Sequence, residues 1–180
     1  MKSISRARAR RFIKEALARV RGDWLVFGGA VLPLLGDGGA RPTLDIDVAA
    51  LGWDAPQSAQ LKWMETAEAL DLAPEAINAA GAYFVSKLKI SEADCTLLAA
   101  AKGVRLFRPG ATAYLLLKLP RFSESDLADC QRWIKRCRKE GEVIARGPVA
   151  RALSRARSRA RDKGDAGLLA RLKVFEEAWG

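Results

Sequence analysis

The alternation of hydrophobic and polar residues predicts a helix at the start of the chain, followed by strands. Residues 3–20 place apolar side chains at helical spacing among arginines and lysines, which predicts an amphipathic helix that ends near Gly22. Residues 24–27 form a short apolar run with aromatic and β-branched members, which is typical of a buried strand. Residues 43–48 alternate polar and apolar positions, as a half-buried strand does.

The same pattern continues with further predicted helices and strands. A helix is expected from Pro56 to about residue 70, and a short one within residues 72–80. Strands are expected at residues 83–85, 95–98 and 104–107, with a turn at Lys102-Gly103 between the last two. Beyond residue 110 the pattern is helical, and residues 146–161 predict a helix that is polar on most faces and poorly packed.

These elements predict an α/β (α+β) fold, in which helices flank a mixed sheet and the C-terminal part is helical and basic. We expect an N-terminal helix in residues 1–21, a core domain in residues 22–110, and helices packed on that core in residues 111–180. A chain of 180 residues is long enough for one core, or for one core with a small appended subdomain.

Composition restricts the chemistry. The 31 lysines and arginines against 21 acidic residues give a net charge of +10, which favours polyanionic partners. The absence of histidine from the sequence excludes imidazole bases, His-dependent triads and zincins. Three cysteines without metal-binding spacing are expected to be the reduced thiols of a cytoplasmic protein. No apolar run approaches the roughly 20 residues of a membrane span, so no membrane association is expected.

Two features with possible chemistry meet in residues 24–48. Gly28 and Gly29 end the first predicted strand, and a turn without side chains lets backbone N–H groups approach a phosphate closely. In the next predicted strand, alternation puts Asp45 and Asp47 on one face. Neighbouring carboxylates repel each other unless a cation lies between them, and Mg²⁺ accepts such oxygen ligands together with substrate phosphates. The stretch therefore predicts a phosphate cradle beside a metal site.

This strand, turn and strand resemble the signature of the nucleotidyltransferase superfamily, in the form found in minimal bacterial members that include abortive-infection, type IV toxin-like proteins. The matching residues are Gly28, Gly29, Arg41, Thr43, Asp45 and Asp47. The resemblance implies that the glycine pair faces a nucleoside triphosphate (NTP) and that Arg41 and Thr43 contribute to its binding. It also implies that the two aspartates hold Mg²⁺ or Mn²⁺. The structural alternative is a plain turn followed by the solvated face of an edge strand.

The superfamily usually offers a third carboxylate on a later strand. Asp94, just before the strand expected at residues 95–98, is the acid that matches this position best. The alternative interpretation of Asp94 is an exposed loop acid.

A second match follows residue 114. Lys118 lies in an apolar helical run, where it is either a surface residue that extends to solvent or a phosphate ligand. The residues that resemble the second signature of the toxin-like group are Lys118, Arg121, Asp126 and Asp129. The resemblance implies that Lys118, as a catalytic residue, and Arg121 contact the nucleotide phosphates, and that the first acid orients the lysine or the arginine. The structural alternative is an N-cap at Ser123 or Ser125, with first-turn acids that complement the helix dipole.

The resemblance implies a Mg²⁺-dependent nucleotidyltransferase that moves a nucleoside monophosphate from an NTP to an acceptor. RNA, such as a tRNA end, fits the net charge, and a protein hydroxyl is the other acceptor class. The resemblance also suggests the toxin of a toxin–antitoxin pair with an acidic antitoxin-like protein partner. The alternative function is an inactive nucleotidyltransferase-like domain that binds RNA or protein through basic helices. In particular, residues 146–161 form either a helix that follows a nucleic-acid backbone or an ordinary exposed helix.

Overall fold

The computed structural model describes residues 6–41, 43 and 45–179. They divide into two compact units, which meet in the sequence between Gly110 and Ala111. None of the described helices is both long enough and apolar enough to cross a membrane.

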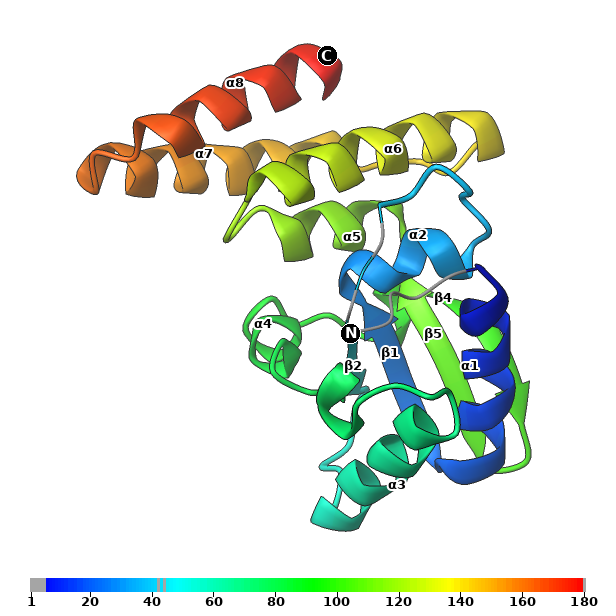
Figure 1. Ribbon diagram of the computed structural model, residues 1–180. Helices are drawn as coiled ribbons and strands as arrows, with labels where there is room; N and C mark the ends of the chain where they lie inside the picture. The colour runs from blue at the N-terminus through cyan, green and yellow to red at the C-terminus, as the bar shows by residue number, and fades with distance from the viewer. Residues whose placement is uncertain (1–5, 42, 44, 180) are drawn as a thin grey trace. The chain divides into compact units, whose positions relative to one another are not determined.

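The first unit is built on a five-stranded mixed sheet with the strand order β3-β2-β1-β5-β4 (Figure 1). Its strands are β1 (Gly22–Phe27), β2 (Ile46–Ala50), β3 (Ile77–Asn78), β4 (Cys95–Ala101) and β5 (Val104–Pro109). β1 pairs antiparallel with β2 and parallel with β5, whereas β3 runs parallel to β2 and β4 antiparallel to β5. The predicted mixed sheet flanked by helices is therefore confirmed.

Two helices, α1 (Arg6–Arg19) and α3 (Gln57–Glu68), share a hydrophobic core with one face of this sheet. Phe12 of α1 stacks on Trp63 of α3, with 6.0 Å between ring centroids, and Trp63 meets Trp24 of β1 edge-on. Ile46 and Val48 of β2 belong to the same core. Because side chains alternate along a strand, the residue between them points to the opposite face of the sheet.

Shorter elements connect the strands. The 3₁₀ turn η1 (Gly28–Ala30) follows β1 directly and continues into α2 (Val31–Leu34). Between β2 and β5 lie η2 (Pro74–Ala76), α4 (Ala82–Lys87) and η3 (Glu92–Asp94). The predicted turn between β4 and β5 is confirmed, with Gly103 at φ +78°.

Two local predictions in this region were wrong. Residues 83–85 form part of the helix α4 and not a strand. In this helix Tyr83 and Phe84 are exposed, and only Val85 is buried. The strand preference of aromatic residues depends on a sheet surface to pack on, which is absent here. Residues 72–80 form only the turn η2 followed by β3, because Ile77 pairs with Ile46 of β2 and enters the core.

The second unit consists of α5 (Ala111–Lys118), α6 (Glu124–Glu140), α7 (Arg146–Asp162) and α8 (Ala166–Trp179) (Figure 1). Tyr114 of α5 stacks on Trp133 of α6 with centroids 4.3 Å apart. The indole N–H of Trp133 donates to the carbonyl oxygen of Ala111 at 2.9 Å. α6 ends at Gly141, which has φ +71° and is in the left-handed conformation.

The prediction that residues 146–161 pack poorly was wrong. α7 buries one side chain in nearly every turn, and these residues are Val149, Leu153, Ala156 and Ala160. Their spacing of three or four residues forms a narrow apolar stripe, which is sufficient for packing although most of the helix surface is polar.

Candidate functional site

The end of β1 meets β2 at a glycine. Phe27 and Asp47 are register partners in the antiparallel pair, so Gly28 lies directly beside the Asp47 side chain. Gly28 has φ +74°, and a Cβ added to it would overlap Oδ2 of Asp47. The position therefore requires both the backbone freedom of glycine and its lack of a side chain.

Gly29 lies close to the side chains of Arg41 and Thr43. A Cβ on Gly29 would lie 2.9 Å from Nη2 of Arg41 and 3.2 Å from Oγ1 of Thr43. Thr43 is buried, and its hydroxyl donates to the carbonyl oxygen of Asp45 at 3.2 Å. Arg41 and Thr43 thus lie against the glycine pair, and Arg41 brings a guanidinium to it.

The two aspartates occupy the start of β2. Asp45 is exposed just before the strand, and Asp47 is half-buried within it. Ile46 and Val48 point into the core with α1 and α3, so Asp47 faces the other side of the sheet. Among the described residues, no group of three or more His, Cys, Asp or Glu side chains is placed to hold a metal ion. A metal ion held here would have the carboxylates of Asp45 and Asp47 as its acidic ligands, and phosphate or water oxygens would complete its shell.

Two residues beside Asp47 were missed by sequence reasoning. A Cβ on Gly81 would lie 2.6 Å from Cε2 of Phe27 and 3.8 Å from Oδ1 of Asp47, so this glycine closes a second side of the carboxylate. Asn78 is the register partner of Asp47 on β3, and its Oδ1 accepts a hydrogen bond from the N–H of Ala80 at 3.0 Å. The signal in the sequence was a tract of small residues after Ile77, which is typical of the end of a strand.

Replacing Gly28 by alanine tests this packing. We expect Gly28→Ala to lower the free energy of unfolding by about 1–2 kcal/mol, because the new Cβ meets Asp47 and a positive φ is unfavourable for alanine. Gly38→Ala is the matched control, since nothing lies within 4 Å of a Cβ at that position. Urea denaturation measures both variants, and equal stabilities would contradict the close approach of Gly28 to Asp47.

Asp94 is not brought together with the aspartate pair. Its Oδ2 accepts hydrogen bonds from the N–H and the hydroxyl of Ser91 at 3.0 and 2.9 Å, which forms the capping box of η3. Asp94 is exposed and precedes β4, and the strand order puts β5 and β1 between β4 and β2. Three strand spacings correspond to roughly 14 Å.

The cysteines are free thiols. Burial, followed by the negative charges of Asp94 and Glu92, raises the pKa of Cys95 to about 12. Burial also raises the pKa of Cys130. These two thiols are therefore protonated at neutral pH and are poor nucleophiles.

Lys118 lies in the second unit within a buried ion-pair network. Its Nζ donates to Oδ1 of Asp126 and to Oδ2 of Asp129, both at 2.9 Å. The three side chains are only 7%, 1% and 2% exposed, respectively. Lys118 is therefore not the surface residue that one interpretation of the sequence predicted. Its charge is balanced by two carboxylates of α6, as a buried charge requires.

Asp126 is the centre of this network. Its Oδ2 accepts from Nε of Arg121 at 3.1 Å, and from the N–H and hydroxyl of Ser123 at 3.0 and 2.8 Å. Burial alone raises the pKa of Asp126, but the hydrogen bond from Arg121 and the charge of Lys118 outweigh it. The pKa of Asp126 is therefore well below its usual range. Ser123 is the N-cap of α6, as one interpretation of the sequence predicted.

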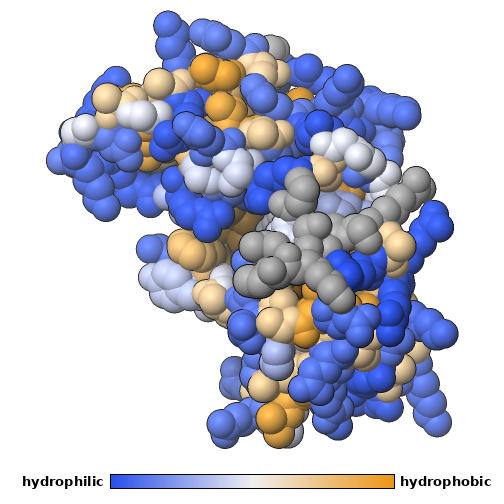
Figure 2. Space-filling view, in the orientation of Figure 1, coloured by the Kyte–Doolittle hydropathy of each residue, from blue (hydrophilic) through white to orange (hydrophobic). Residues whose placement is uncertain are grey.

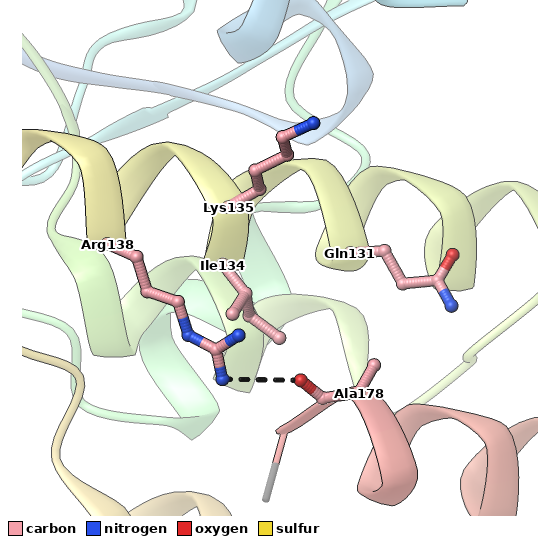
Figure 3. Close-up of a pocket in the computed structure, with 5 residues that line it drawn as sticks. All are labelled: Gln131, Ile134, Lys135, Arg138 and Ala178. Atoms are coloured by element: carbon pink, nitrogen blue, oxygen red, sulfur yellow. Dashed lines mark hydrogen bonds between the residues drawn. The ribbon is translucent and has the colours of Figure 1, made fainter.

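A pocket of about 310 Å³ lies between α6 and α8 (Figure 3). It is lined by Gln131, Ile134, Lys135, Arg138 and Ala178. Arg138 donates to the carbonyl oxygen of Ala178 at 3.4 Å, which ties the two helices together at one side of the pocket. None of the residues predicted from the sequence to form a site lines it.

Comparisons of this chain with protein-family models, with curated proteins and with solved structures found no match. The residues predicted from the sequence to form a site gather in two places. Of those predicted, one group gathers at the glycine pair of the first unit: Gly28, Gly29, Arg41, Thr43 and Asp47, with Asp45 beside them in the sequence. A second group gathers in the second unit: Lys118, Arg121, Asp126 and Asp129.

Proposed function

We propose that the chain is a Mg²⁺-dependent nucleotidyltransferase, which moves a nucleoside monophosphate from an NTP to RNA, such as a tRNA end. The observation that carries the proposal is the contact of the Asp47 carboxylate with the bare backbone of Gly28, next to Arg41 at Gly29. A turn without side chains, a carboxylate pair and a guanidinium are groups that bind a triphosphate and its metal ion.

Each residue has a defined role in this proposal. The turn at Gly28 and Gly29 lets the triphosphate approach the main chain, and Arg41 neutralises phosphate charge through paired hydrogen bonds. Asp45, just before β2, and Asp47, within it, would hold the metal ion, for which their hard oxygen atoms are suitable ligands. When bound, Mg²⁺ supplies charge stabilisation at the phosphoryl oxygens. The Thr43 hydroxyl holds the main chain of Asp45 in place.

Transfer of label from each of the four α-³²P nucleotides tests the proposal. Total cellular RNA and total protein serve as acceptors, with Mg²⁺ present or removed by EDTA. We expect label in RNA from one or more nucleotides, abolished by EDTA and restored by Mg²⁺ or Mn²⁺. Label in protein alone would contradict the RNA acceptor, and label in neither fraction would contradict the enzymatic function.

The second candidate function is a nucleotidyltransferase-like domain that binds RNA or protein without turnover. It is favoured by one observation, namely that no third acidic side chain joins Asp45 and Asp47 among the described residues. Calorimetric titration with a non-hydrolysable NTP distinguishes the two functions. Binding of the NTP with Mg²⁺ in the absence of any label transfer is the result expected of the inactive domain.

A further inference from the structure

The exposed side of α7 carries a row of arginines. Arg151, Arg155 and Arg159 recur at every fourth residue, and all three are exposed. Because four residues are close to one helical turn, they lie along one side of the helix, and we call them the arginine stripe. The opposite side is the buried one described above. Figure 2 shows hydrophilic residues over much of the visible surface of the second unit.

Among the described residues, the arginines of the stripe form no ion pairs, whereas several other arginines of the chain do. These pairs include Arg19 with Glu15, Arg105 with Asp23, Arg136 with Glu140, and Arg157 with Glu176. Arg157 is itself on α7, so the helix does use an acid where α8 supplies one. Within the part of the chain that the structure describes, no acidic side chain forms an ion pair with the stripe. This includes Asp162, which follows Arg159 by three residues on the same helix but does not pair with it.

This arrangement is unfavourable for the isolated protein. Like charges four residues apart on a helix repel each other and weaken it. Arginine guanidinium groups bind phosphate oxygens through two parallel hydrogen bonds, so a chain of phosphates offsets the repulsion. We propose that the arginine stripe binds the phosphate backbone of RNA. The choice of RNA among polyanions rests on the proposed function, since RNA is the acceptor there.

RNA fits the stripe better than an acidic protein does. The residues beside the three arginines are small, mainly alanine and serine, and the large hydrophobic side chains that are exposed in the described residues all lie outside α7. Protein interfaces are centred on buried aromatic or apolar residues, which α7 does not offer. Contacts to phosphates need no such centre, because their affinity comes mainly from charge and the release of counterions.

The test compares two triple variants of the full chain. Arg151→Gln/Arg155→Gln/Arg159→Gln removes the stripe and keeps a good helix former at each position. Lys135→Gln/Lys139→Gln/Lys173→Gln removes the same charge from exposed positions on α6 and α8. Binding of a fluorescein-labelled RNA hairpin, of a DNA hairpin of the same sequence and of polyglutamate is measured by anisotropy over a range of salt concentrations. No nucleotide is present, so the result does not depend on label transfer.

We expect the stripe variant to bind the RNA hairpin about tenfold more weakly or worse, while the lysine variant changes much less. The slope of log K against log salt should fall in magnitude by about 2–3 in the stripe variant, as the loss of three phosphate contacts predicts. Equal losses in both variants, or unchanged binding in the stripe variant, would overturn the proposal. Tighter stripe-dependent binding of the DNA hairpin or of polyglutamate would overturn it too, and would assign the stripe to DNA or to an acidic protein.

Discussion

Replacing Asp45 and Asp47 by asparagine is expected to reduce nucleotidyl transfer by about 10³-fold or more. Asparagine has the same shape as aspartate but lacks the negative charge, so the strand keeps its packing and loses its affinity for a divalent cation. Asp45 is exposed, and asparagine occupies the same space as the Asp47 side chain beside Gly28. The unfolding temperature should therefore stay close to that of the unchanged chain.

Label transfer measures the rate in this experiment, and thermal unfolding checks the fold. Asp54→Asn is the matched control, because Asp54 is an exposed acid in the segment that follows β2. The control should transfer label normally. Full activity in the Asp45→Asn/Asp47→Asn variant would exclude the two carboxylates as metal ligands, whatever the acceptor.

Replacing Lys118 by methionine is expected to destabilise the protein by about 3–5 kcal/mol. The change leaves the carboxylates of Asp126 and Asp129 buried without the ammonium group that contacts both. Methionine has nearly the same length and is apolar, so the loss reports the charge and not a cavity. Urea denaturation followed by circular dichroism measures the change in the free energy of unfolding.

Two further variants separate a structural role of Lys118 from nucleotide binding. Lys135→Met, at an exposed position of α6, should change stability by less than about 0.5 kcal/mol. Lys118→Met/Asp129→Asn should regain part of the loss, because one of the two uncompensated carboxylates is removed as well. If Lys118→Met were as stable as the unchanged chain but bound NTP more weakly, Lys118 would be a phosphate ligand.

The stability of this network also depends on pH. The pKa of Asp126 is lowered in the folded protein, so its carboxylate stabilises the fold above the ordinary pKa of about 3.8. This contribution is lost progressively as the pH falls from there toward the folded pKa. Because Lys118 is one cause of the lowered pKa, the acid-induced loss should be smaller in Lys118→Met than in the unchanged chain.

The local pattern of hydrophobic and polar residues was sufficient to predict many of the helices and strands. Short apolar runs predicted β1, β4 and β5, alternation of polar and apolar residues predicted β2, and the helical pattern predicted α1, α3 and the C-terminal helices. It was not sufficient at residues 83–85, where three residues with strand preference form a helix because no sheet surface is available to them. A strand needs a partner, which lies elsewhere in the chain.

The candidate site shows the same division. Sequence spacing alone put Gly28 next to Gly29 and Asp45 two residues from Asp47. Only the pairing of β1 with β2 brings Gly28 against Asp47, and only the path of the intervening loop brings Arg41 to Gly29. Gly81 and Asn78 reach Asp47 through the pairing of β3 with β2, which spans about thirty residues, so the small residues after Ile77 could mark the end of a strand but not its partner.

The sequence predicted the fold class, the basic charge, the exclusion of histidine chemistry and, as one of two interpretations, the N-cap of α6, because these depend on composition or on neighbours within a few residues. The tertiary structure decided which charges are paired. Packing of α5 against α6 gives Lys118 two buried carboxylates, whereas Arg151, Arg155 and Arg159 of α7 form no ion pair with an acidic side chain of the described residues. Charge interactions depend on distance in space and on burial, and neither can be read from the order of residues alone.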